Sequence, residues 1–280
     1  MNVPGVREDH RGPPNMLTIG DARLAVFDEG TGEPVVLIQT ALTADELVPM
    51  ADGLRQELRT IVYHRRGYGV SSPARGPGSI AQDATDCRAL LGALRIPRVH
   101  VVGVSYSGAV AIQLAALAPR TVHSLTVIEP PPVHVASAAE FCAANERLIA
   151  ARQARGTDAA LAEFLGLLVG PNWRTDMERH LPGSVDQMTR DAATFFDTDL
   201  PALLTWQFTA ADAARITCPV LYVGGTASGS WFNQVRDLIL DWFPGAESVA
   251  VDGADHSLAV THTEHVAAAV AAFLRRHPIW

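Results

Sequence analysis

A serine stands among small residues at the point where an apolar, β-branched run gives way to a helical run. Val99–Val104 predicts a strand, Ala109–Leu117 predicts a helix, and Ser105 falls in the turn between them. Such a turn is tight and strained, and it lifts the serine hydroxyl above the sheet. The next amide, that of Tyr106, would lie at the helix N-terminus, where it can donate to an oxyanion. The pattern therefore indicates a nucleophile for acyl transfer.

Two other interpretations of this turn stay open. Gly103 and Gly108 have the outer spacing of the dinucleotide-binding pattern Gly-x-Gly-x-x-Gly, in which the backbone must approach a pyrophosphate. Ser105 occupies the place of the middle glycine, which argues against a dinucleotide, and we expect no cofactor. The other interpretation is an ordinary strand–helix turn with an incidental serine.

A nucleophile on such a turn needs a rigid sheet beneath it, and the chain has the material for one. Of its 280 residues, 48% are hydrophobic and 19% are charged, which is enough for a large buried core. Three helices are expected to begin at capping patterns of Ser or Thr followed three residues later by Glu or Gln, starting at Thr43, Ser79 and Thr261. Between helical stretches lie short unbroken apolar runs, typical of strands buried on both faces of a mostly parallel sheet: Arg23–Phe27, Val35–Ile38, Thr60–Tyr63, Val99–Val104, Ser124–Ile128, Val220–Val223 and Ser248–Val251.

The rhythm of strand and helix changes in the middle of the chain. After Pro130 come helix-rich segments with several aromatic residues, and strand signals resume at Cys218. We interpret residues 131–217 as a helical cap inserted into an α/β core that comprises residues 16–130 and 218–280. Residues 1–15 are polar and rich in Pro and Gly, and they are expected to form a flexible arm.

Composition excludes several classes of function. The formal charge of −8 argues against nucleic acid as a partner, because neutralising phosphates needs a basic surface. All 22 basic residues are arginine, which removes lysine Schiff-base chemistry, the phosphate-loop lysine and Ser–Lys hydrolases. No His or Cys constellation has metal-ligand spacing, so no metal is expected.

The chain has the sequence features of a cytoplasmic protein. Its three cysteines are odd in number and far apart, which fits a reducing compartment better than a disulfide framework. It has neither a secretion signal nor a run of eighteen apolar residues, so no association with a membrane is expected. A homodimer is compatible with the sequence.

Four motifs together resemble the α/β-hydrolase superfamily, and the likeness runs from about Arg23 to Phe273. They are the Gly103–Gly108 turn, the segment Tyr63–Ser71, the strand Pro219–Val223 and the segment Gly253–His256. The resemblance implies an α/β-hydrolase fold: a mostly parallel sheet flanked by helices, with an inserted helical cap. It also implies that His256, which follows the last strand, is the catalytic base.

The acid of a catalytic triad is missing from its commonest place. Relatives usually carry Asp a few residues past the strand that follows the cap, but Val223–Ser230 contains no carboxylate. An imidazole that becomes charged needs an anion on its far nitrogen. Glu129, at the end of the strand after the nucleophile strand, is the best replacement, and zearalenone-type lactonases place their acid there. Glu129 could instead be a gate or a helix cap, and Asp252 or Asp255 could be the acid.

The second oxyanion donor and the substrate contacts are expected from loops and from the cap. Most relatives have His-Gly after the strand Val35–Ile38, whereas this chain has Gln39-Thr40-Ala41-Leu42. Alignment by strand end makes the amide of Ala41 the partner of the Tyr106 amide. An apolar small-molecule substrate is expected to contact a lid of cap aromatics and nearby polar groups, although both sets could serve packing alone: Gln39, Thr40, His134, Trp173, Trp206 and Trp231.

The expected activity is hydrolysis of an ester or lactone of an apolar small molecule by Ser105, His256 and Glu129, through an acyl-enzyme. A macrocyclic or polyketide-like lactone is the leading specific hypothesis. A serine at the turn disfavours epoxide hydrolysis and dehalogenation, which use a carboxylate nucleophile in this fold. Three alternatives stay open: a carbon–carbon bond hydrolase, a non-hydrolytic polyketide-type cyclase, and a small-molecule receptor with a vestigial triad.

Overall fold

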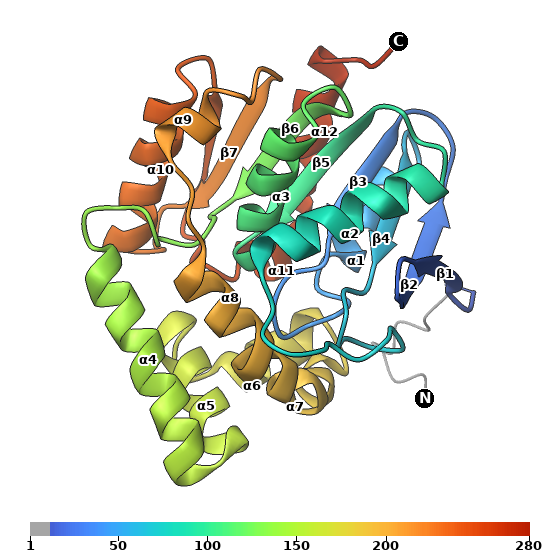
Figure 1. Ribbon diagram of the computed structural model, residues 1–280. Helices are drawn as coiled ribbons and strands as arrows, with labels where there is room; N and C mark the ends of the chain where they lie inside the picture. Colours follow the sequence, from blue (N-terminus) through green and yellow to red (C-terminus); the bar gives the residue numbers. More distant parts are fainter. Residues whose placement is uncertain (1–11) are drawn as a thin grey trace, which may run out of the picture.

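The computed structural model describes residues 12–280 and shows one sheet of eight strands between layers of helices (Figure 1). The strand order is β1-β2-β4-β3-β5-β6-β7-β8. β1 and β2 run antiparallel to their neighbours, whereas all the other pairs are parallel. The α/β-hydrolase fold is thereby confirmed. The strands are β1 (Asn15–Ile19), β2 (Ala22–Glu29), β3 (Pro34–Ile38), β4 (Arg59–Tyr63), β5 (Val99–Val104), β6 (Val122–Ile128), β7 (Val220–Gly225) and β8 (Glu247–Val251).

Strand β1 is the one element of the sheet that the sequence does not predict. It pairs with β2 at the edge of the sheet, and it is partly exposed, so that its apolar pattern is weak. Its first residue, Asn15, falls within the arm expected over residues 1–15. The first eleven residues of that arm lie outside the described residues.

Helices cover both faces of the sheet because successive strand residues point to opposite sides. Val101 of β5 packs in the core layer under α2 (Ile80–Ala93), α3 (Tyr106–Leu117) and α10 (Ser230–Trp242). Its neighbour Val102 packs in the other layer, with α1 (Val48–Leu54), α11 (Leu258–Thr261) and α12 (Thr263–Arg276). None of the helices within residues 12–280 has both the length and the apolar character needed to cross a bilayer.

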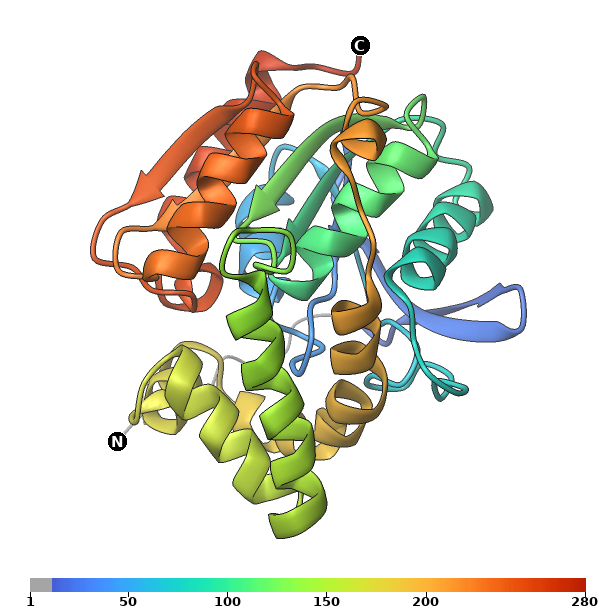
Figure 2. The same ribbon diagram turned by 60° about the vertical axis from the view of Figure 1, so that its left-hand side comes forward.

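The segment between β6 and β7 is helical and covers the end of the sheet at which the parallel strands finish (Figure 2). Many of its apolar side chains form a third cluster of their own, together with core residues such as Leu42 and Val260. The helices of this cap are α4 (Ala138–Arg155), α5 (Thr157–Leu168), α6 (Trp173–His180), α7 (Ser184–Thr194), η1 (Phe195–Asp199), α8 (Leu200–Thr205) and α9 (Ala210–Ala213).

Only one of the three predicted capping patterns caps a helix. The Ser79 hydroxyl accepts a hydrogen bond from the Gln82 amide at 3.0 Å, as expected. The prediction is wrong for Thr261, which ends α11 and donates to the Ser257 carbonyl. It is also wrong for Thr43, because α1 begins only at Val48. A four-residue capping pattern does not determine whether a helix begins directly after it.

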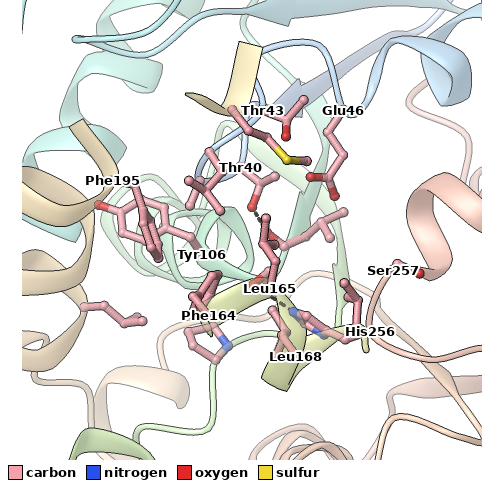
Figure 3. A pocket seen from close by; sticks show the side chains of 18 of the residues that line it. Thr40, Thr43, Glu46, Tyr106, Phe164, Leu165, Leu168, Phe195, His256 and Ser257 are labelled. Atoms are coloured by element: carbon pink, nitrogen blue, oxygen red, sulfur yellow. Dashed lines mark hydrogen bonds between the residues drawn. The ribbon is translucent and has the colours of Figure 1, made fainter. Parts of the chain in front are cut away.

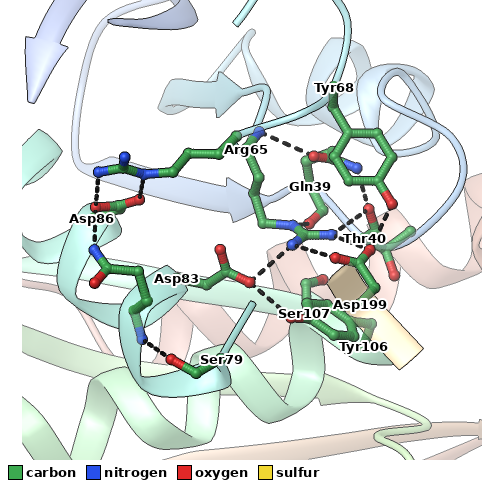
Figure 4. Close-up of polar contacts among 12 residues, drawn as sticks. Gln39, Thr40, Arg65, Tyr68, Ser79, Asp83, Asp86, Tyr106, Ser107 and Asp199 are labelled. Carbon is green, nitrogen blue, oxygen red and sulfur yellow. Dashed lines mark hydrogen bonds and ion pairs between the residues drawn. The ribbon is translucent and has the colours of Figure 1, made fainter. Parts of the chain in front are cut away.

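A buried arginine joins the cap to the core (Figure 4). Arg65, just after β4, donates through Nη2 to Asp199 Oδ2 at 2.7 Å and through Nη1 to Asp83 Oδ2 at 2.8 Å. The Tyr68 hydroxyl donates to the same Asp199 oxygen at 2.5 Å. Asp199 ends the π-helical turn η1, a rare conformation that is frequent at functional sites. The contact therefore fixes where the cap sits over the strand ends.

We expect Asp199→Ala to lower the free energy of unfolding by about 3–5 kcal/mol, because it leaves a buried guanidinium without its main partner. Asp197→Ala is the matched control. Asp197 lies on the same turn as Asp199, its side chain is 63% exposed, and it pairs with Arg152 of α4. This exposed pair should contribute less than about 1 kcal/mol. Urea unfolding followed by fluorescence measures both values, and equal losses would contradict the structural role of Asp199.

Candidate active site

Ser105 lies between β5 and α3 in a backbone conformation that residues other than glycine rarely adopt. Its φ is 47° and its ψ is −120°. A Cβ on Gly103 would approach the Ser107 carbonyl oxygen to 2.2 Å, and a Cβ on Gly108 would lie 2.9 Å from Pro130 Cβ. Glycine at both positions therefore lets the chain turn sharply and pack against β6, which keeps the strained serine in place.

The imidazole of His256 bridges the serine and a carboxylate. Its Nε2 lies 3.0 Å from Ser105 Oγ, and its Nδ1 lies 2.7 Å from Glu129 Oε2. His256 is 8% exposed and Glu129 is completely buried. The ring of Phe232, from the first turn of α10, stacks on the imidazole with ring centres 4.0 Å apart and planes 16° apart. The ring is thus fixed by two hydrogen bonds and one stacking contact.

Glu129 is held as firmly as the ring that it contacts. It follows β6 with a φ of 43°, and its amide donates to the Val223 carbonyl at 3.1 Å. Its Oε1 accepts a hydrogen bond from the Gly225 amide at the end of β7, at 2.7 Å. A Cβ on Gly225 would lie 2.1 Å from the Ala254 carbonyl oxygen, so glycine there lets the histidine loop pack closely. Both carboxylate oxygens of Glu129 are therefore engaged.

The two competing carboxylates bind elsewhere. Asp255 Oδ1 accepts from the amide and the hydroxyl of Ser257, at 2.9 and 2.5 Å. Asp252 Oδ1 accepts from the Thr226 hydroxyl at 3.3 Å, on the exposed side of the loop. Neither reaches a nitrogen of His256 in a hydrogen bond. The geometry favours Glu129 over Asp252 and Asp255 as the partner of the imidazole.

The loop after β3 brings the amide of Ala41 to the same pocket as Tyr106. The Thr40 hydroxyl ties this loop to the Val104 carbonyl at 2.8 Å, and the Tyr68 hydroxyl accepts from the Leu42 amide at 3.1 Å. Within residues 12–280, neither the Ala41 amide nor the Tyr106 amide donates to another backbone group. Both are free to bind an oxyanion, and their pairing stays a prediction.

Gln39 does not reach the pocket, although it was predicted to contact substrate. It is 1% exposed, and its side-chain oxygen accepts from the Arg65 amide at 3.0 Å. The guanidinium of Arg65 in turn donates to the carbonyls of Gln39 and Thr40, at 2.9 and 3.3 Å. Gln39 and Arg65 therefore position the loop that carries Ala41, while Thr40 lines the pocket as predicted.

A pocket of about 900 Å³, its open mouth included, lies above Ser105 between the core and the cap (Figure 3). Its walls are mostly apolar and come largely from the cap, with Phe141, Phe164, Leu165, Met188, Phe195 and Leu203 among them. A minority of the lining residues are polar: Thr40, Thr43, Glu46, Ser105, Tyr106, Asn145, His256 and Ser257. An apolar molecule with few polar groups fits such walls.

Four predicted substrate contacts lie outside the pocket lining: His134, Trp173, Trp206 and Trp231. Trp206 packs against His134 with ring centres 4.7 Å apart and planes tilted by 54°, and its Nε1 donates to Gln113 at 3.0 Å. Trp231 packs edge-on against Phe141, and Trp173 is buried within the cap cluster. These large rings fill space between elements, and smaller phenylalanines face the pocket instead.

The sequence reasoning missed several of the pocket residues, among them Asn145, Phe164, Phe195 and Phe232. Phe164, Leu165 and Leu168 lie on one face of α5, and their helical spacing is the signal that could have marked this face. No sequence pattern distinguishes a helix face that meets a cavity from one that meets another helix.

Comparisons with known proteins fit this architecture. The rhodomycin D methylesterase DauP of Streptomyces sp. strain C5 is 27% identical over 299 residues, which cover 94% of this chain and 98% of DauP. Three other curated relatives match over only 42%, 12% and 35% of their own lengths.

Solved structures match the fold along nearly the whole chain. A thermophilic esterase from Thermogutta terrifontis superimposes with a TM-score of 0.79 at 19% identity, over 96% of this chain and all of the esterase. The enol-lactonase from Burkholderia xenovorans LB400 gives a TM-score of 0.77 at 20% identity, over 93% of this chain and all of the lactonase. The model of the alpha/beta hydrolase family matches residues 40–273, and the chain therefore belongs to that family.

Proposed function

We propose that the protein is a serine hydrolase that cleaves an ester or a lactone of an apolar small molecule. The observation that carries this proposal is the chain of hydrogen bonds from Ser105 Oγ through His256 to Glu129, with steps of 3.0 and 2.7 Å. A hydroxyl, an imidazole and a carboxylate in this order form the arrangement that activates a serine for attack on a carbonyl.

The reaction proceeds in two halves. His256 Nε2 takes the Ser105 proton as Oγ attacks the carbonyl carbon, and Glu129 stabilises the imidazolium that forms. The amides of Ala41 and Tyr106 donate to the oxyanion of the tetrahedral intermediate. The imidazolium then protonates the leaving alkoxide, and the acyl group remains on Ser105. Water, deprotonated by His256, cleaves the acyl-enzyme and returns the serine to its starting state.

The walls of the pocket and the relatives favour an apolar substrate with an ester bond. No arginine lines the pocket in the described part of the chain, so nothing there would pair with a charged carboxylate or phosphate substrate. DauP is named as a methylesterase, and the Burkholderia xenovorans enzyme as an enol-lactonase. The position of Glu129 resembles that in zearalenone-type lactonases, so a macrocyclic or polyketide-like lactone stays the leading specific substrate.

Ser105→Ala should lower ester or lactone hydrolysis by a factor of about a thousand or more, because no other group can form the acyl-enzyme. A fluorophosphonate probe should label the wild-type protein at Ser105, as peptide mapping would establish, and should not label the variant. Ser248→Ala, on the exposed side of β8, is the matched control and should keep the wild-type rate. Labelling without turnover of esters, lactones or diketones would favour a receptor, and full turnover by Ser105→Ala would favour a cyclase.

Glu129→Gln should lower kcat by about a thousandfold while keeping the shape of the site, since an amide cannot stabilise the imidazolium. Asp255→Asn should change kcat only slightly, because that carboxylate binds Ser257 rather than His256. Steady-state kinetics on one ester tests both variants. The reverse order of effects would show that the acid is assigned to the wrong residue.

A further inference from the structure

One carboxylate faces the pocket without a role in the hydrogen-bonded chain at Ser105. Glu46 lies in the loop between β3 and α1 and lines the apolar pocket. Glu46 is half-buried, and burial raises the pKa of its carboxyl to about 7. A carboxyl group is costly to place in apolar surroundings, and a position that served packing alone would favour an apolar residue.

Two further polar atoms in the pocket lining also lack partners. Thr43, one turn before Glu46, is completely buried, and its hydroxyl forms no hydrogen bond with any residue from 12 to 280. Asn145, from α4 of the cap, donates through Nδ2 to the Phe141 carbonyl at 2.8 Å, which leaves its Oδ1 as an unused acceptor. Buried polar groups normally have hydrogen-bond partners, so these atoms point to groups that a ligand would supply.

Thr43 and Glu46 are together at one end of the pocket. A backbone hydrogen bond of 3.4 Å, from the Glu46 amide to the Thr43 carbonyl, holds them in a single turn of the loop. Figure 3 shows both at the top of the view and His256 at the bottom, with apolar side chains such as Leu165 between them. A molecule with its carbonyl at Ser105 would therefore reach them with a more distant part of its structure.

The donor and acceptor pattern of this pair matches a neutral hydroxyl. An alcohol or phenol can donate to the Glu46 carboxylate and accept from the Thr43 hydroxyl, so that both protein groups gain a partner. A carboxylate ligand would repel Glu46. An ammonium group has three donors and no acceptor, so it could not accept from Thr43, and it would lose more hydration in these apolar surroundings.

We propose that Thr43 and Glu46 form a hydroxyl-binding subsite, and that the substrate is an apolar ester or lactone bearing an alcohol or phenol away from the bond that is cleaved. The inference rests on the proposed hydrolysis at Ser105 and names the class of substrate for that same site. A site built to bind a substrate hydroxyl discriminates against the analogue that lacks it, because its own polar groups are then left unpaired.

The test compares matched esters on the full-length protein. Methyl hexanoate, octanoate and decanoate are each paired with the counterpart that carries a terminal hydroxyl, and with one that carries a terminal amine. At pH 8 the wild type should cleave at least one hydroxy ester with kcat/KM about tenfold or more above its plain partner. Equal rates at all three lengths, or a preference for the amine, would overturn the subsite.

Two variants assign that preference to the pair. Glu46→Gln and Thr43→Val should each lower the ratio of hydroxy to plain ester severalfold or more. The first replaces a charged acceptor with a weaker neutral one, and the second removes the hydroxyl that donates. Glu264→Gln, on the exposed first turn of α12, is the matched control and should keep the wild-type ratio. A ratio that stays at the wild-type value in both Glu46→Gln and Thr43→Val would refute the assignment.

The same ratio should rise as the pH increases through about 7, because the Glu46 carboxyl ionises there and a charged acceptor binds a hydroxyl more strongly. His256 also lines the pocket, and because it acts at the ester carbonyl of both substrates, its contribution cancels in the ratio. The adjacent Asp45 carboxylate is engaged by His64 and Gln187, at 3.0 and 2.9 Å. In Glu46→Gln the ratio should not change with pH, and a rise like that of the wild type would overturn the proposal.

Failure of the subsite is distinguishable from failure of the proposed function. The Ser105→Ala protein binds without turnover, so calorimetry with the same ester pairs measures the preference for the hydroxyl directly. A preference in binding without hydrolysis by the wild type would keep the subsite and refute the hydrolase. Hydrolysis of plain and hydroxy esters at equal rates, with equal binding, would keep the hydrolase and refute the subsite.

Discussion

The carboxylate of Glu129 connects the ends of separate strands, and the geometry of the site depends on it. One oxygen accepts from the Gly225 amide at the end of β7, and the other contacts His256 in the loop after β8. Because β5 lies directly beside β6, the same carboxylate also sets the imidazole against Ser105. A carboxylate with both oxygens engaged can hold the ring in a single orientation, which is what proton transfer from the serine requires.

Strain at two adjacent strand ends accompanies this arrangement. Ser105 and Glu129 both have positive φ, with values of 47° and 43°, and neither is a glycine. Such conformations cost free energy and persist only where the surroundings fix them. Here the surroundings are the fully buried β5, the almost fully buried β6, and the glycines that permit close packing. Arg65 provides a second constraint, because one guanidinium binds both the loop that carries Ala41 and the cap residue Asp199. The position of the cap and the shape of the predicted oxyanion site are therefore coupled.

The core of the fold could be predicted from the sequence because its signals are local. The mostly apolar run of β5, the small residues around Ser105 and the turn before His256 each lie within a few residues. Glu129 could be proposed because the usual place of the acid holds no carboxylate. Its contact with His256 is long-range and depends on strand order, which no short pattern encodes.

The lining of the pocket could not be predicted, for a physical reason. Trp173 and Trp206 have the size and polarity expected of a substrate lid. Yet Trp173 is buried in the cap cluster, and Trp206 packs in the core layer with its Nε1 donating to Gln113. Whether a side chain faces a cavity or a neighbouring helix depends on how the cap helices pack against one another. The same limit applies to Thr43 and Glu46, whose spacing is that of a helix cap. That these two residues line the pocket and do not cap a helix follows from the three-dimensional path of the loop.

The proposed catalytic residues and the walls of the pocket thus come from different parts of the molecule. Ser105, Glu129 and His256 lie at the ends of core strands and in the loops that follow them, where the sheet positions them. Most of the apolar walls come from cap helices, which are joined to the core by polar contacts such as that of Arg65 with Asp199. Glu46 belongs to the core and yet lines this mostly apolar pocket. The position of such a polar group relative to Ser105 depends on the core loops, whereas the position of the apolar walls depends on how the cap helices pack.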